Sequence, residues 1–212
     1  MNIVIIGASG FIGSALRNEA LARGHAVTAL VTRPEKLAPQ AHLTALATDV
    51  MDVQKLSAQL SGFDAVISAF SGHAQADILD YYVTGIGRIV AAAKEARVPR
   101  LLVVGGAGSL EVAPGQLLID APDFPPQYKA SAHGAQQALE LLRKESSLNW
   151  TMLSPAAVIA PGQRSGVFRT ALDRLLTRED GSSSISVEDY ALAMIDELEE
   201  PVHPRKRFTV GY

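Results

Sequence analysis

The 212-residue chain contains no cysteine. This absence excludes disulfide bonds, catalysis by a thiolate, and zinc or iron–sulfur centres bound through cysteine. Unbroken apolar runs are short as well, and none reaches the roughly 18 residues that a membrane-spanning helix needs. The opening MNIVIIGASG lacks the basic segment and the long apolar stretch of a secretory signal. These absences predict a cytoplasmic protein that does not engage a membrane.

Excess charge is also small, because 19 lysine and arginine residues stand against 22 aspartate and glutamate residues, a formal net charge of −3. No global basic field would draw the chain to nucleic acid, so no nucleic-acid partner is expected. Hydrophobic residues make up 48% of the chain, which is enough to bury a core. The length suits one domain over residues 1–212.

Short apolar runs alternate with amphipathic stretches along residues 1–155. Alternation of this kind predicts right-handed crossovers and a Rossmann-like α/β fold, in which helices cover both faces of a doubly wound parallel sheet. The expected strands are Ile3–Ile6, Ala26–Val31, Leu43–Ala47, Ala65–Ala69, Leu101–Val104 and Thr151–Leu153, and the expected helices are Phe11–Arg23, Val53–Leu60, Ile78–Arg97 and Ser131–Glu145.

The remaining segments are expected to form small elements on the substrate side. The loops from about 105 to 127 and from about 155 to 185 leave the carboxyl ends of strands, where doubly wound sheets bind their ligands. A polar turn at Gly181–Ser184 precedes an expected helix at Val187–Glu199, and Arg207–Val210 is expected to add a closing strand.

A glycine loop follows the first apolar strand and opens a helix. Its G-x-x-G-x-x-G spacing permits a tight turn, a close approach of phosphate to the backbone, and close packing of helix on strand. The helix N-terminus would present free N–H groups to a pyrophosphate. We therefore predict a dinucleotide site formed by Gly7, Ser9, Gly10, Phe11, Ile12 and Gly13. The alternative is a tight turn that binds no ligand.

The second strand is followed by Arg33, at the position where an NAD site carries an acidic residue for the ribose hydroxyls. Because an arginine can bind a 2′-phosphate with two hydrogen bonds, the sequence favours NADP over NAD. A solvated surface arginine is the alternative. Asp49, with Val50 beside it, ends the third strand and is a candidate for the adenine side, and an N-cap role for Asp49 is nearly as plausible.

Small residues end the fourth strand, at Ser68 and Ala69, and would let the nicotinamide ribose run close to the backbone. Phe70 is a candidate cover for the cofactor, and a position at the edge of the core is the alternative. The other histidines, His25, His42, His73 and His203, form no i, i+4 pair, so no metal site is expected.

The glycine loop, the GGAGSL segment at 105–110 and the LSPA segment at 153–156 resemble those of the short-chain dehydrogenase/reductase superfamily. More narrowly, the chain is similar to its atypical, NmrA-like branch of NAD(P)H-flavin reductases, related to biliverdin reductase B. The ISVEDYALAMIDELE segment at 185–199 extends the resemblance over nearly the whole chain. The resemblance implies that the backbone at Pro155 holds the nicotinamide carboxamide, and Gly105, at the end of the fifth strand, is a further candidate for cofactor binding.

The Tyr-x-x-x-Lys dyad of ordinary superfamily members is absent, because no tyrosine has a lysine four residues later. Alcohol–ketone chemistry needs a placed proton donor. The missing dyad therefore favours hydride transfer from NADPH to a planar conjugated acceptor such as a flavin, a quinone or a tetrapyrrole, where solvent can supply the proton.

Three residues are candidate catalytic groups. The resemblance implies that Ser109 stands where the superfamily keeps its catalytic serine, and that His133 corresponds to a histidine of biliverdin reductase B. Tyr128 adjoins the same helix start and would line the same mouth. The alternatives are a turn serine and an exposed histidine in a first helical turn.

Two functions remain open. The first is an NADPH-dependent oxidoreductase that reduces a small planar substrate. The second is a non-catalytic NADP(H)-binding redox sensor that acts through a protein partner, which the missing dyad fits nearly as well. An epimerase is a weaker third reading, because the short segment after Pro161 leaves little room for a nucleotide-sugar lobe.

Overall fold

The structure is a computed structural model that describes residues 1–73 and 75–212. Its centre is an eight-stranded sheet in the order β10-β12-β8-β5-β4-β1-β2-β3, parallel throughout except for β10, which runs antiparallel to β12. The strands are β1 (Asn2–Ile6), β2 (Ala26–Val31), β3 (Leu43–Ala47), β4 (Ala65–Ser68), β5 (Leu101–Val104), β8 (Trp150–Ser154), β10 (Arg169–Ala171) and β12 (Lys206–Gly211).

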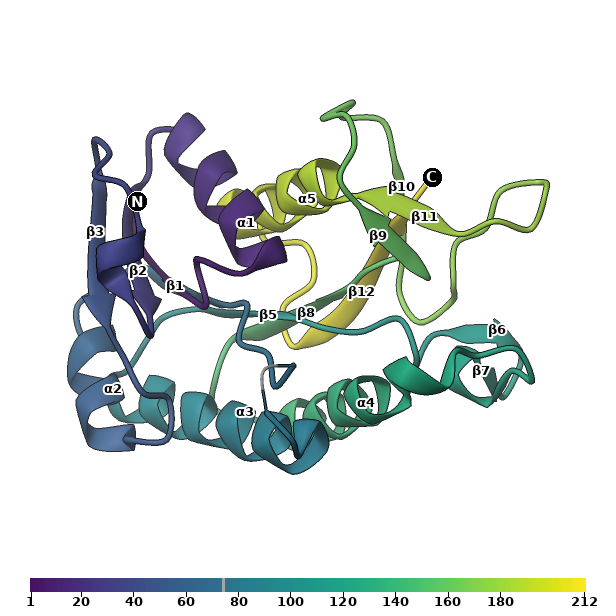
Figure 1. Ribbon diagram of the computed structural model, residues 1–212, viewed down its shortest axis with the longest axis horizontal. Coiled ribbons are helices and arrows are strands. Elements are labelled where there is room, and N and C mark those ends of the chain that lie inside the picture. The colour runs from purple at the N-terminus through teal and green to yellow at the C-terminus, as the bar shows by residue number, and fades with distance from the viewer. Residues whose placement is uncertain (74) are drawn as a thin grey trace.

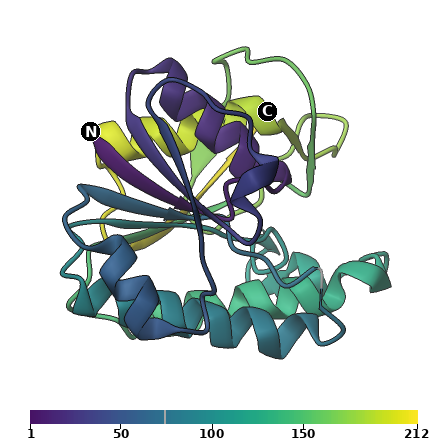
Figure 2. The same ribbon diagram turned by 60° about the vertical axis from the view of Figure 1, so that its left-hand side comes forward.

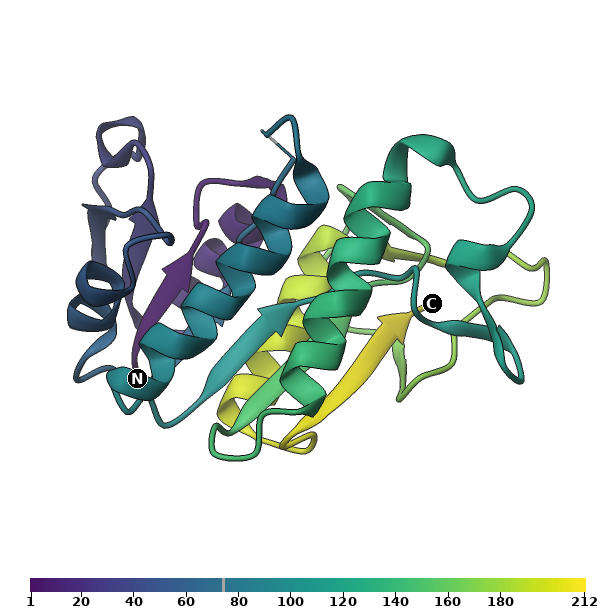
Figure 3. The same cartoon turned by 90° about the horizontal axis from the view of Figure 1, so that it is seen from below.

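Helices cover both faces of this sheet (Figure 1). One face carries α1 (Phe11–Ala22) and α5 (Val187–Glu199), and the other carries α2 (Val53–Leu60), α3 (Ile78–Glu95) and α4 (Lys129–Arg143). Figure 2 shows the twisted sheet between the two helical layers, and from below α3 and α4 lie side by side across it (Figure 3). The predicted Rossmann-like, doubly wound α/β fold is confirmed.

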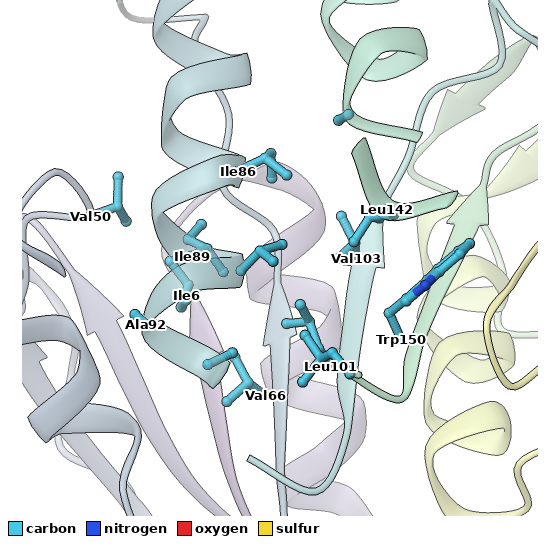
Figure 4. Packing of buried hydrophobic residues seen from close by; sticks show 14 of the residues in the cluster. Ile6, Val50, Val66, Ile86, Ile89, Ala92, Leu101, Val103, Leu142 and Trp150 are labelled. Atoms are coloured by element: carbon cyan, nitrogen blue, oxygen red, sulfur yellow. The ribbon is translucent and has the colours of Figure 1, made fainter. Parts of the chain in front are cut away.

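Alternate residues of the central strands point to opposite faces, and this alternation creates two separate cores. On β1, Val4 and Ile6 face the α3–α4 layer, whereas Ile3 and Ile5 face the α1–α5 layer. Figure 4 shows part of the first of these cores, where Ile6 lies beside Ile89 of α3, and side chains of β4, β5 and β8 continue the core across the sheet. Strands buried on both faces need continuous apolar sequence, which explains why their runs stand out in the chain.

Smaller elements surround the carboxyl ends of the strands. β9 (Val158–Ala160) pairs in parallel with β11 (Ser184–Ser186), and β6 (Glu111–Ala113) pairs antiparallel with β7 (Gln116–Leu117). Three short 3-10 helices follow β2, β7 and the proline-rich loop: η1 (Pro34–Lys36), η2 (Leu118–Asp120) and η3 (Pro126–Tyr128).

The predicted elements are present, and the differences lie at their ends. The helix expected over Ser131–Glu145 begins two residues earlier, at Lys129, and α3 ends at Glu95 before Arg97 adopts a positive φ of 54°. Strands β9, β10 and β11 lie in the segment expected to be loop at about 155 to 185. Each is only three residues long, too short to carry a readable alternation.

Candidate cofactor and substrate site

A cavity of about 780 Å³ opens at the carboxyl ends of four neighbouring strands, β1, β4, β5 and β8. Each strand end contributes a consecutive run of lining residues. The strand order reverses between β1 and β4, because the chain first builds β2 and β3 on one side and then returns to the other. Ligands of doubly wound sheets bind at this reversal point. The four runs are Gly10–Gly13, Ala69–His73, Val104–Gly108 and Pro155–Ile159.

The glycine loop is as tight as its spacing predicts. Gly7 has a φ of 77°, and a β-carbon there would lie 2.6 Å from the carbonyl oxygen of Ala69, at the end of β4. A β-carbon on Gly13 would lie 2.1 Å from the carbonyl oxygen of Gly7. Both positions therefore need glycine, since the helix start packs directly on the turn.

The N-terminus of α1 faces the cavity without a side chain to cap it. Gly10 is the N-cap residue, no acidic residue lies in the first turn, and Gly10, Phe11 and Ile12 line the cavity. Unpaired N–H groups and a partial positive charge at a helix start bind anions. The glycine cradle and this helix start fit the pyrophosphate of a dinucleotide.

Gly106 and Gly108, in the loop after β5, lie against helix α4. A β-carbon on Gly106 would lie 2.8 Å from the β-carbon of Ala135, and one on Gly108 would lie 2.7 Å from that of Ala132. The first half of α4 therefore sits directly against the loop after β5. This contact explains why the residues on both sides are small, and it limits the width of the cavity.

Two aromatic residues under the cavity stack on each other. The rings of Phe70 and Tyr82 are nearly parallel, at 6° and 6.1 Å between centroids, and Phe70 lies against Gly85 of α3. The Tyr82 hydroxyl donates to the carbonyl of Val104 at 3.3 Å, and burial raises the pKa of this tyrosine. Sequence reasoning missed Tyr82, because on α3 it falls on the same helical face as core residues such as Ile86.

The far part of the cavity wall is apolar and aromatic, with one carboxylate. These residues come from η2, from η3 and the turn before it, and from β9. Tyr128 and Val158 stand at the rim, 56% and 57% exposed. The wall consists of Leu118, Asp123, Phe124, Pro125, Tyr128, Val158 and Ile159.

Several predicted cofactor residues do not line this cavity. Arg33 is exposed beyond the end of β2, as the predicted contact with a 2′-phosphate requires. Asp49 accepts a hydrogen bond from the Met51 N–H at 2.9 Å, while the N-cap of α2 is Asp52. Val50 and Ser68 are buried in the core, so only their backbone could meet a cofactor. The cavity is lined by the predicted residues Ala69, Phe70, Gly105 and Pro155. The turn before α1 contains Gly7 and Ser9, which do not line the cavity.

The three catalytic candidates fall in different places. Tyr128 lines the cavity. His133 is exposed on α4 and does not line it, because its neighbours Ala132 and Ala135 face inward instead. Ser109 lies behind the loop, where its hydroxyl is 3.3 Å from Nη1 of Arg207. The catalytic roles of all three stay predictions, and the geometry favours Tyr128.

Arg207 is a buried cation that joins the substrate-side loops to the sheet. Its guanidinium donates to the carboxylate of Asp173 at 2.5 and 2.8 Å and to the carbonyl of Ser109 at 3.3 Å. Burial lowers the pKa of Arg207, and the hydrogen bonds to Asp173 oppose that effect. The sequence offered no signal for this contact, since Arg207 and Ser109 are 98 residues apart.

The segment after β9 is fastened to α1 and α5. Arg164 donates two hydrogen bonds of 2.8 Å to Glu19 of α1, which also accepts one from Arg23 at 2.7 Å. Buried Asp189 of α5 accepts from the Ser165 hydroxyl at 2.5 Å and from the Tyr212 hydroxyl at 2.7 Å. These contacts hold the end of the Pro155–Ile159 wall in place.

Neither a membrane-spanning helix nor a cluster of metal ligands occurs within residues 1–73 and 75–212. No helix there is long and apolar enough to cross a membrane. Within the same residues, no group of three or more histidine and carboxylate side chains is arranged to hold a metal ion.

Comparison with known proteins places the chain in a family. Residues 7–201 match the family model described as NAD(P)H-binding. YwnB, an uncharacterized protein of Bacillus subtilis, is 40% identical over 99% of this chain and 98% of its own. A crystal structure from Bacteroides thetaiotaomicron described as a "putative epimerase" is 46% identical, with a TM-score of 0.92 over 100% of this chain and 96% of that one.

A second solved structure, a "putative NADH-flavin reductase" from Streptococcus pneumoniae, is 36% identical, with a TM-score of 0.89 over 100% of this chain and 99% of that one. These matches agree with the atypical short-chain dehydrogenase/reductase branch that the sequence resembles. They also agree with the glycine cradle at the start of α1. The chain belongs to the NAD(P)H-binding family.

Proposed function

We propose that the protein is an NADPH-dependent reductase that transfers a hydride to a flavin, a quinone or a similar planar conjugated acceptor. The shape of the cavity carries this proposal, because it runs from the start of α1 past the ends of β5 and β8 to an apolar and aromatic wall. One end suits an anion and the other suits a planar ring, so a dinucleotide and an acceptor fit together.

The backbone does most of the binding. Gly10–Gly13 would hold the pyrophosphate, the strand ends at Gly105 and Pro155 would hold the nicotinamide, and Arg33 would select the 2′-phosphate of NADP. Phe124 and Tyr128 stand opposite, on the acceptor side. Fixing both rings in contact makes the transfer effectively unimolecular, which is the main rate advantage that this site offers.

When bound, NADPH supplies the hydride. Complete reduction of a flavin or quinone also needs a proton, and no tyrosine–lysine dyad is present to donate it. Tyr82 is unsuited, because burial raises its pKa and its hydroxyl already donates to Val104. The exposed rim at Tyr128 and Val158 admits water, which supplies the proton.

The experiment is a turnover assay with NADPH and a panel of riboflavin, FMN, FAD and quinones, followed through the loss of NADPH absorbance. We expect turnover with at least one acceptor class and tighter binding of NADPH than of NADH. If the protein binds NADPH but turns over no acceptor of the panel, the proposal is contradicted. The redox-sensor hypothesis then remains. A pull-down compared between NADP and NADPH would then test for a partner that responds to the cofactor's redox state.

The similarity to a protein described as an epimerase does not change this proposal. The missing tyrosine–lysine dyad opposes an epimerase, and the segment after Pro161 is short for a nucleotide-sugar lobe.

A further inference from the structure

The apolar and aromatic part of the cavity wall carries one carboxylate, that of Asp123. We propose, on the basis of the reductase function above, that the natural acceptor is an uncharged planar molecule and that the carboxylate of Asp123 rejects acceptors that carry phosphate or carboxylate groups. Among the described residues that line the cavity, Asp123 is the one aspartate, glutamate, lysine or arginine.

The turn that carries Asp123 is held in place by its own sequence. It reads Ala121-Pro122-Asp123-Phe124-Pro125, so a proline with a fixed φ stands on one side and a second proline follows Phe124. The Phe124 N–H donates to the carbonyl of Ala121 at 3.0 Å, which closes the turn. The carboxylate is therefore presented at the cavity from a constrained backbone.

The wall around this carboxylate is suited to an uncharged ring. Leu118, Phe124 and Ile159 are partly buried, and Val158 and Tyr128 form the rim. Apolar and aromatic surfaces stabilise a planar ring by burying its area and by stacking. A phosphate placed against Leu118, Phe124 and Ile159 would lose hydration without gaining a hydrogen bond from these side chains.

The anion-binding part of the cavity lies at its other end. The start of α1 at Gly10–Gly13 faces the cofactor's pyrophosphate and is not open to an acceptor once the cofactor is bound. Lys129 is the nearest cation in sequence, but it is exposed and does not line the cavity. A negatively charged acceptor therefore meets Asp123 first.

A comparison of riboflavin with FMN isolates the effect of charge, because the two molecules share the same isoalloxazine ring and differ by a phosphate. Coulomb repulsion between a carboxylate and a phosphate in a water-exposed mouth amounts to about a tenfold effect on binding. We expect kcat/KM for riboflavin to exceed that for FMN by about this factor at low salt, and the gap to shrink as salt is added.

The test compares Asp123→Asn and Asp123→Lys with the control Asp120→Asn. Asp120 is an exposed carboxylate three residues away that does not line the cavity. We expect Asp123→Asn to raise kcat/KM for FMN toward the riboflavin value, and Asp123→Lys to reverse the preference. The control should keep the wild-type ratio of kcat/KM for riboflavin to kcat/KM for FMN.

Failure of this inference is distinct from failure of the proposed function. Equal kcat/KM values for riboflavin and FMN in the wild type, or an unchanged ratio in Asp123→Lys, would overturn the role of Asp123 while the reductase function stands. If no acceptor is turned over, quenching of riboflavin and FMN fluorescence by the NADP-loaded protein still measures the two affinities. Equal affinities would overturn the inference there too.

Discussion

Gly13 and Gly7 are in backbone contact, so closely that a β-carbon on Gly13 would lie 2.1 Å from the Gly7 carbonyl oxygen. The same carbonyl accepts a hydrogen bond from the Gly10 N–H at 3.0 Å. Helix α1 and the loop before it are thus one rigid unit, and the direction in which its free N–H groups point depends on three glycines.

Gly13→Ala should therefore disrupt the dinucleotide site. The obstructing atom is backbone, which cannot rotate away, so we expect loss of stability by about 1–3 kcal/mol and a marked loss of NADPH affinity. Urea unfolding and NADPH titration measure the two effects. The matched control is Gly87→Ala in α3, whose β-carbon would lie 3.7 Å from Leu141, an ordinary contact. The control should be neutral or stabilising by about 0.5–1 kcal/mol, because alanine favours helix.

Arg33→Glu should shift the cofactor preference from NADPH toward NADH. An arginine binds a phosphate through two charge-assisted hydrogen bonds, whereas a glutamate repels phosphate and can accept bonds from ribose hydroxyls. We expect NADPH to bind at least about tenfold more weakly and NADH binding to hold or improve. Lys36→Glu, in the η1 turn three residues away, makes the same charge change as a control. Equal losses in both variants would mean that general charge, rather than a specific contact, binds the cofactor.

Tyr128 and Ser109 should respond differently to truncation. Tyr128→Ala removes part of the cavity rim, so we expect KM for the acceptor to rise with little change in stability. Ser109→Ala removes a hydroxyl near the buried Arg207, so we expect a loss of about 1 kcal/mol in stability and a smaller effect on turnover. Steady-state kinetics and thermal unfolding separate the two. A collapse of kcat in folded Ser109→Ala would restore this serine as a catalytic group.

Acidic pH should weaken the contact between α1 and the segment that follows β9. Hydrogen bonds from Arg164 lower the pKa of Glu19, burial opposes them, and the Arg23 bond adds to the lowering, so the pKa lies below its ordinary value. A carboxyl group with a lowered pKa stabilises the fold fully above its unfolded pKa of about 4.3, and this contribution is lost as pH falls through the folded value.

Glu19→Gln should therefore cost about 1–2 kcal/mol at neutral pH, a modest figure because Arg164 is 53% exposed. The difference from the wild type should disappear in acid. Urea unfolding across the acidic range measures it, with Glu35→Gln on an exposed turn as the control. A difference that stays constant with pH would rule out the ionised Glu19 as its source.

The cofactor half of the site could be predicted from the sequence because its signals are local. Gly7, Gly10 and Gly13 lie within seven consecutive positions, and the apolar strand before them is buried on both faces. Both features are set by residues a few positions apart. The position of Arg33, just after β2, could be predicted for a similar reason, since β2 follows α1 after a short turn.

The acceptor half could not be predicted in the same way. Asp123 and Val158 line the same cavity, and Ser109 meets Arg207, so both sites depend on segments distant in sequence. The role of His133 is inferred from the position of a histidine in a related protein. A shift of one residue along α4 turns a side chain about 100° around the helix, and Ala132 lines the cavity where His133 does not.

The position of β12 has a kinetic consequence. It lies between β8 and β10, and β10 has no other neighbour in the described part of the sheet. β10 therefore joins the sheet only together with or after residues 206–211, and Arg207 of the same strand contacts Asp173 and Ser109. Pairings between distant segments form slowly, whereas β1, α1 and β2 follow one another directly. During refolding, protection of the glycine loop should precede protection of the acceptor wall.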